Sequence, residues 1–173
     1  MRHNTNQKPT SFFVTSPVPC PYLQDKTERR LVADLFSQDP VLLNNKLSRA
    51  GFRRSHNLIY TPVCDGCSAC LAVRSVVQEF KPSNSQRRIL RLNQNLVIEE
   101  NKAQATSERF ELFAMYQNSR HTGGDMATMD FYDFQALVEE TPVITSVIDF
   151  YDVEGTLIGG CLVDTMDDGL SAV

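Results

Sequence analysis

Four cysteines are the residues of this chain whose type and spacing point most clearly to chemistry. Three of them, Cys64, Cys67 and Cys70, follow one another at intervals of three residues, and Cys20 lies between two prolines. Two thiolates at this interval on a tight turn can occupy one edge of the tetrahedron that zinc prefers, and Gly66 permits such a turn. The spacing predicts that the four cysteines bind either zinc or an iron–sulfur cluster, because both accept four thiolates.

Two other interpretations of the thiols stay open. Free cysteine is often buried in a core without any ligand, and Cys161 fits this interpretation because it alternates with apolar neighbours. Disulfides belong to oxidising compartments, whereas the N-terminus lacks the apolar core of a signal peptide. No apolar run approaches the length of a membrane span. We therefore expect a cytoplasmic chain that has reduced cysteines and no membrane partner.

The charges of the chain differ in sign between its two parts. Residues 1–109 carry sixteen Lys and Arg against nine Asp and Glu, and residues 110–173 carry one Arg against twelve acids. The sums are +7 and −11, which together give the net charge of −4. A basic excess is typical of proteins that bind nucleic acid, and it is also typical of a solvated helix face. The basic residues gathered in one stretch are Arg53, Arg54, Arg74, Lys81, Arg87, Arg88 and Arg91.

The first elements along the chain are predicted from local signals. Residues 11–15 are typical of a short strand that ends at a proline. Asp25 and Glu28 have the spacing of a capping box, and apolar residues follow with helical period as far as Phe36. These signals predict a strand followed by a first helix.

The cysteine triplet is flanked by further predicted elements. Asp39 followed by Pro40 predicts a second helix, which ends at Gly51. Residues 52–60 and 71–77 are predicted as two strands. This arrangement places the triplet at the end of a hairpin, where a metal-binding turn is common.

The rest of the chain alternates helices with β-prone segments, which indicates an α+β fold. In chain order, we expect a basic helix at 84–92, a strand at 96–98, a helix that opens at Thr106 and breaks at 123–124, a helix that opens at Thr128, a hairpin of strands at 143–151 and 156–163, and the start of a strand at 170–173.

Several short motifs, spread over nearly the whole chain, resemble those of one family. They are Ser16-Pro17-Val18-Pro19-Cys20-Pro21-Tyr22, Gly51-Phe52-Arg53-Arg54-Ser55, Tyr60-Thr61-Pro62 leading into the cysteine triplet with Val73-Arg74 after it, Phe80-Lys81-Pro82-Ser83 with Arg87-Arg88, Tyr116 with Ser119-Arg120-His121, and Asp167-Asp168-Gly169-Leu170-Ser171. With these motifs the chain resembles the aminoacyl-tRNA–protein transferases, and among them the bacterial aspartate/glutamate leucyltransferases of the N-degron pathway.

The resemblance implies a division into domains. It implies a flexible tail at 1–10, an N-terminal cysteine-cluster domain of α+β type at 11–82, and a domain similar to the GNAT N-acetyltransferases at 83–173. The second domain would use aminoacyl-tRNA in place of acetyl-CoA, so no acetyl-CoA is expected. Members of the family continue beyond the strand that ends here at Val173. We therefore expect that this chain holds only the first half of the GNAT-like domain.

The resemblance also implies an activity, the transfer of leucine from leucyl-tRNA to proteins whose first residue is Asp or Glu. The ester of the aminoacyl-tRNA is already activated, so the enzyme has to align two substrates and stabilise an oxyanion. An acidic acceptor calls for arginine, whose planar fork binds a carboxylate with two hydrogen bonds. The candidates for this role are Arg53, Arg54 and Arg74. Because side chains alternate along a strand, Arg53 and Arg54 should face opposite sides.

The remaining candidate residues fall into two groups. Tyr116, Arg120 and His121 at a helix end are candidate catalytic residues, with His121 as a proton acceptor, although a histidine at a helix end is also a common capping residue. A basic helix can contact tRNA phosphates without reading bases, and this role is predicted for Arg87, Arg88 and Arg91.

Two functions of other classes are the alternatives. A non-enzymatic RNA-binding module would use the cysteines as a metal knuckle, and it would bind RNA without transfer. An acetyltransferase would need a glycine-rich loop that opens a helix to hold pyrophosphate. No such loop occurs in this sequence, since Gly123-Gly124 does not follow a predicted strand.

Overall fold

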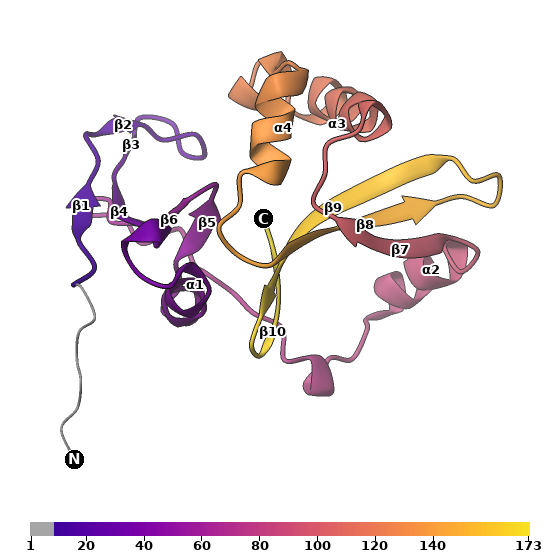
Figure 1. The fold of residues 1–173 in the computed structure, drawn as a ribbon, viewed down its shortest axis with the longest axis horizontal. Helices are drawn as coiled ribbons and strands as arrows, with labels where there is room; N and C mark the ends of the chain where they lie inside the picture. The colour runs from indigo at the N-terminus through magenta and orange to yellow at the C-terminus, as the bar shows by residue number, and fades with distance from the viewer. Residues whose placement is uncertain (1–8) are drawn as a thin grey trace.

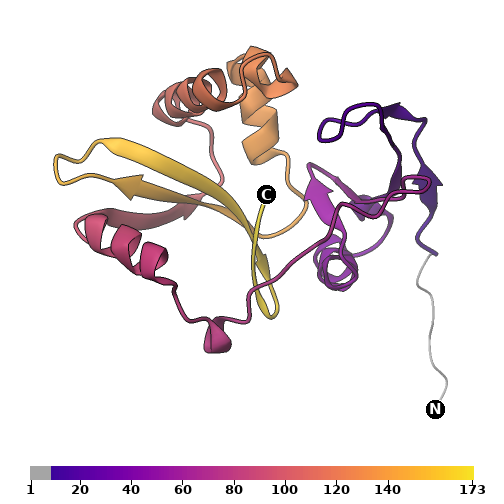
Figure 2. The same cartoon turned by 180° about the vertical axis from the view of Figure 1, so that it is seen from behind.

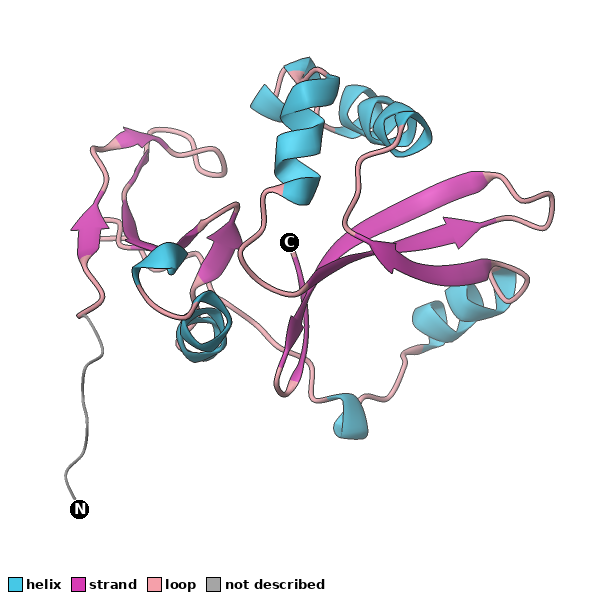
Figure 3. Cartoon of the chain, in the orientation of Figure 1, coloured by secondary structure: helices cyan, strands magenta, loops and turns pink. Residues whose placement is uncertain are grey.

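The computed structural model describes residues 9–173 apart from the side chain of Asp125, so most of the predicted tail at 1–10 lies outside the described residues. The described chain is of mixed α+β type, as the sequence predicts, with two four-stranded sheets and one two-stranded sheet (Figures 1 and 3). All strand pairs are antiparallel. None of the helices within residues 9–173 is long and apolar enough to cross a bilayer.

The first four-stranded sheet has the strand order β1-β4-β6-β5. Its strands are β1 (Phe12–Val14), β4 (Arg30–Asp34), β6 (Leu58–Pro62) and β5 (Arg53–Ser55). Helix α1 (Pro40–Arg49) packs on this sheet, and together they bury a small apolar core. The core residues are Ala33, Leu35, Leu43, Leu47 and Ile59. The predicted strand at 11–15 is confirmed by β1.

The helix predicted between residues 25 and 36 is wrong. The chain forms β3 (Thr27–Glu28), which pairs with β2 (Val18–Pro19), and then β4, followed by a short 3₁₀ helix, η1 (Leu35–Ser37). β4 lies between β1 and β6 and makes ladder hydrogen bonds on both edges. Asp25 has a φ of 59°, in the left-handed region, which does not suit a helix N-cap. Pairing with distant strands therefore outweighs the local helical period.

The helix predicted after Asp39 is confirmed by α1. The Asp39 carboxylate accepts a hydrogen bond from the amide of Leu42 at 3.1 Å, and Pro40 takes the first helical position. Gly51 has a φ of 89°, a conformation that ends the helix and that glycine adopts without strain.

The hairpin predicted around the cysteine triplet is wrong. Residues 52–60 fold back on themselves as β5 and β6, which pair through Arg54 and Ile59. Residues 71–76 form no strand, and a 3₁₀ turn, η2 (Val77–Glu79), follows them. The triplet therefore lies in an irregular loop after β6, because the hairpin partner of β6 precedes it in sequence.

The second four-stranded sheet has the order β10-β9-β8-β7. It consists of β7 (Val97–Lys102), β8 (Thr145–Tyr151), β9 (Leu157–Met166) and β10 (Gly169–Ala172). Helices α3 (Ser107–Arg120) and α4 (Phe131–Glu139) lie on one side of it, and α2 (Asn84–Leu92) lies on the other (Figures 1 and 2). Buried side chains of Phe134, Val138 and Val147 form the core under α3 and α4.

The elements predicted in this part are largely confirmed. Ser83 caps α2 in a capping box with Gln86, and Thr106 caps α3 by accepting from the amide of Arg109. α4 starts later than predicted, because Asp130 is its N-cap and the residues before it form a 3₁₀ turn, η3 (Asp125–Thr128). A capping carboxylate that satisfies two amides determines the start of this helix.

Candidate functional site

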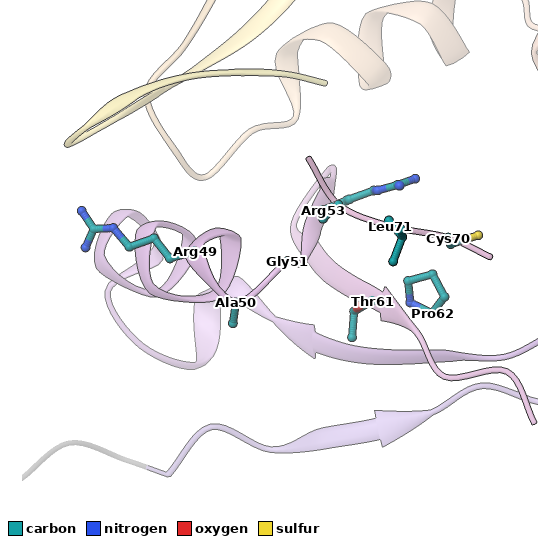
Figure 4. A pocket seen from close by; sticks show the side chains of 9 residues that line it. Arg49, Ala50, Gly51, Arg53, Thr61, Pro62, Cys70 and Leu71 are labelled. Carbon is teal, nitrogen blue, oxygen red and sulfur yellow. The ribbon is translucent and has the colours of Figure 1, made fainter. Parts of the chain in front are cut away.

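A hollow of about 360 Å³ lies where α1 ends and β5 begins (Figure 4). Its walls come from the end of α1, from β5 and β6, and from the loop that follows the cysteine triplet. Gly51 turns the chain from α1 into β5, and a Cβ on it would meet the Cβ of Ala72 at 3.5 Å, so the loop closes over the turn. The lining residues are Arg49, Ala50, Gly51, Arg53, Thr61, Pro62, Cys70, Leu71 and Ala72.

Arg53 is the charged side chain of the hollow that remains available to a ligand. It is exposed, and no carboxylate among the described side chains pairs with it. A guanidinium of this kind can bind a carboxylate with two parallel hydrogen bonds. The carbonyl end of α1 borders the same hollow and carries the negative end of the helix dipole, which favours a cation. The hollow therefore suits a ligand that carries both a carboxylate and an amine.

Arg54 faces the opposite side of β5, as the alternation predicts. Its Nε donates to Asp164 Oδ2 at 2.5 Å, and its Nη2 donates to Asp164 Oδ1 at 2.7 Å. Both side chains are 2% exposed. Arg54 is thus occupied by Asp164 and does not line the hollow, so the structure separates it from Arg53.

Two further arginines face the acidic turn between β9 and β10. Arg49 lines the hollow with its stem, but its guanidinium points away and donates to Asp167 at 2.6 Å and Asp168 at 3.2 Å (Figure 4). The hydrogen bond with Asp168 and the charge of Asp167 raise the pKa of Arg49. Arg74 lies 3.8 Å from Asp168 and does not line the hollow. Arg49 was not predicted. Its place two residues before Gly51, which ends the helix, indicates that it lies beside the turn into β5.

The four predicted metal ligands are not gathered at one point. Cys64 and Cys67 are half-buried in a turn in which the Cys67 amide donates to the Cys64 carbonyl at 3.3 Å, and Gly66 there has a φ of 65°. Cys70 is exposed at the hollow, and Cys20 is half-buried beside β2. Among the side chains that the structure describes, no three of Cys, His, Asp or Glu are close enough to hold a metal ion. The thiols as placed do not form the predicted tetrahedron.

The candidate catalytic residues lie at the exposed end of α3. The ring nitrogen Nε2 of His121 is 3.3 Å from the hydroxyl of Tyr116, and the two rings are 5.4 Å apart between centroids. His121 also ends the helix, since its amide donates to the carbonyl of Gln117 at 2.8 Å. Tyr116 and His121 are therefore brought together, with Arg120 in the last helical turn. None of the three lines the Arg53 hollow.

The predicted tRNA-binding residues lie on α2, whose side chains are all exposed or half-exposed. Arg87 donates to the carbonyl of Pro82 and to the side chain of Asn84, which anchors it at the start of the helix. Arg88 and Arg91 are exposed. The three arginines thus lie on one exposed helix, which is drawn below the second sheet in Figure 1.

A second buried ion pair, in the second sheet, was not predicted. Asp149 of β8 is fully buried, and its carboxylate accepts from Arg109 of α3 at 2.5 Å and from Asn101 of β7 at 3.0 Å. The pair ties α3 to the sheet. The signal in the sequence was an acid inside a β-prone apolar run, which requires a partner when buried.

Comparison with known proteins gives a consistent result along the chain. Residues 18–88 match the family model described as "Arginine-tRNA-protein transferase, N terminus", and residues 108–173 match the one described as "Arginine-tRNA-protein transferase, C terminus".

Individual relatives carry the name aspartate/glutamate leucyltransferase. The protein of Paramagnetospirillum magneticum is 49% identical over 173 residues, which cover 100% of this chain and 71% of the relative. That of Gluconacetobacter diazotrophicus is 47% identical over 100% of this chain and 66% of its own length. That of Granulibacter bethesdensis is 48% identical over 96% of this chain and 62% of its own length. The chain thus spans about two thirds of the length of these relatives.

Proposed function

The chain belongs to the arginine-tRNA-protein transferase family, and on this premise we propose that it transfers leucine from leucyl-tRNA to the N-terminal Asp or Glu of acceptor proteins. Such a transfer marks the acceptor for degradation through the N-degron pathway. The names of the relatives support both the leucine donor and the acidic acceptor. The reaction would take place in the cytoplasm.

The observation that carries the proposal is the exposed Arg53, which lines the hollow between α1 and β6 and has no carboxylate partner among the described side chains. An acceptor that begins with Asp or Glu presents a side-chain carboxylate and an α-amine a few bonds apart. Arg53 would bind the carboxylate, and the carbonyl end of α1 would accept a hydrogen bond from the amine. A neutral first residue would leave the guanidinium unpaired, so the hollow would select acids.

The chemical step asks little of the protein beyond alignment. The α-amine attacks the ester carbon, the tetrahedral oxyanion collapses, and the 3′ hydroxyl of the tRNA leaves. An α-amine has an ordinary pKa of about 8, so a modest base suffices to make it neutral. His121, which lies beside Tyr116, is the candidate for that base, and Arg120 is the candidate cation for the tRNA end, although neither residue lines the Arg53 hollow. The exposed arginines of α2 would contact the phosphates of the tRNA.

The domain assignment is part of the proposal. A cysteine-bearing domain at 11–82 and a GNAT-like domain at 83–173 agree with the two matched segments at 18–88 and 108–173. They also agree with the separate cores under α1 and under α3 and α4. In this assignment the first domain would hold the acceptor and the second would hold the aminoacyl end of the tRNA.

A zinc ion or iron–sulfur cluster at Cys20, Cys64, Cys67 and Cys70 remains a prediction from the spacing of the cysteines. The turn at Cys64 and Cys67 supports it, and the placement of the four thiols does not. Elemental analysis and the visible absorbance of freshly purified protein decide between zinc and iron. A colourless, metal-free sample that is fully folded would contradict both.

The direct test is a transfer assay with labelled leucyl-tRNA and peptides that begin with Asp, Glu or Asn. We expect label on the first two peptides, and the relative from Paramagnetospirillum magneticum serves as the positive control. If the relative transfers leucine and this chain joined to the remaining part of the relative does not, the proposed activity is contradicted. Salt-sensitive RNA binding without transfer would instead favour the RNA-binding module.

A further inference from the structure

The two four-stranded sheets are joined by a buried ion pair whose two residues lie far apart in the sequence. Arg54 on β5 and Asp164 on β9 are 110 residues apart, and they share two hydrogen bonds of 2.5 and 2.7 Å. Two parallel hydrogen bonds of this kind fix the orientation of the guanidinium relative to the carboxylate as well as their distance, since each nitrogen must face one of the two oxygens. The pair therefore sets how β5 lies relative to β9.

The remaining polar atoms of the pair are also satisfied. Thr145 of β8 donates its hydroxyl to Asp164 Oδ1 at 2.8 Å, and Arg54 Nη1 donates to the carbonyl of His56 at 2.9 Å. Nearby, the amide of Asp167 donates to the side chain of Asn45 at 2.9 Å. A buried charge pair with every partner in place is rigid, because any rotation of the side chains leaves a charge unpaired.

β5 is the strand that connects this pair to Arg53. It is an edge strand of three residues, and its neighbour within the sheet is β6 alone. Arg53 and Arg54 are consecutive, so a strand that turns Arg54 inward must turn Arg53 outward. From this geometry we infer that Arg54 and Asp164 are positioning residues, which hold Arg53 in the acceptor hollow. The inference rests on the proposed function, in which Arg53 binds the acidic first residue of the acceptor.

The test is a double-mutant cycle on the binding of a fluorescent peptide that begins with Asp. Arg54→Lys keeps the charge but loses the fork, and we expect binding about tenfold weaker, since small misplacements of a binding group are costly. In an Arg53→Met background, Arg54→Lys should cause no further weakening. General structural damage would weaken binding in both backgrounds, and that result would overturn the inference.

A second measurement does not depend on the peptide. Amide hydrogen exchange should quicken about tenfold in the β5–β6 segment of Arg54→Lys, while α3 exchanges as in the wild type. Unchanged exchange in β5–β6 would overturn the positioning role. If Arg54→Lys does not fold, the paired replacement Arg54→Met with Asp164→Leu removes the fork without leaving a buried charge, and the same two results are expected of it.

The two proposals fail in different ways. If wild-type protein binds peptides that begin with Asp and Asn equally, the acceptor role of Arg53 fails, and hydrogen exchange still decides the positioning role. If wild type prefers Asp and Arg54→Lys retains that preference in full, the positioning role alone fails.

Discussion

The buried pair of Arg54 and Asp164 makes a quantitative prediction about stability. Both side chains are 2% exposed, so Asp164→Leu leaves a guanidinium buried without its counter-charge. Removing one partner of such a pair costs about 3–5 kcal/mol, a large part of the 5–15 kcal/mol by which domains are typically stable. Replacing both partners, as in Arg54→Met with Asp164→Leu, leaves no charge behind and should restore most of the free energy of unfolding.

The assay is urea unfolding followed by circular dichroism. With a slope of about 2 kcal/mol per molar urea, a loss of about 4 kcal/mol lowers the midpoint by about 2 M. Arg49→Met is the matched control, because it removes an arginine from the same junction whose two carboxylate partners are half-exposed, and its midpoint should stay close to that of the wild type. If Asp164→Leu unfolds at the wild-type midpoint, or if the double variant is no more stable than the single one, the reasoning is refuted.

Three further predictions concern other parts of the molecule. Asp149→Leu removes the buried partner of Arg109 and should lower the free energy of unfolding by about 3–5 kcal/mol, measured by the same urea assay; an unchanged midpoint would show that α3 does not depend on this pair. Asp39→Ala removes the cap of α1 and should cost about 1 kcal/mol, whereas Asp39→Asn should cost less; equal losses would contradict a capping role. Arg91→Gln on α2 should reduce the slope of log affinity for tRNA against log salt concentration by about 1, and an unchanged slope would exclude a phosphate contact.

Elements with local signals were predictable from the sequence. α1 was predicted because Asp39, Pro40 and Gly51 each determine the backbone near them, and these signals act within one turn of the helix. The region of β4 was predicted wrongly because its apolar residues fit a helical period, while its partners β1 and β6 lie far away in sequence. Pairing with distant strands leaves little trace in the local pattern.

The site was predictable in part for the same reason. Alternation along the strand correctly separated Arg53 from Arg54, since it depends on two adjacent residues. The partner of Arg54 was not predictable, because Asp164 is brought to it by the arrangement of two sheets. The opposite net charges of the two parts of the chain were visible in the sequence, and some of those charges meet at this junction in Arg54 with Asp164 and Arg49 with Asp167.

The central claim is that Arg53 recognises the acidic first residue of the acceptor. The most direct measurement is the ratio of leucine transfer to a peptide that begins with Asp over one that begins with Asn, for the wild type and for Arg53→Met, with Arg74→Met as control. A hydrogen bond to a charged group contributes about 1.5–3 kcal/mol, so the ratio should fall about 10- to 100-fold in Arg53→Met and change little in Arg74→Met. A ratio in Arg53→Met equal to that of the wild type would contradict the claim.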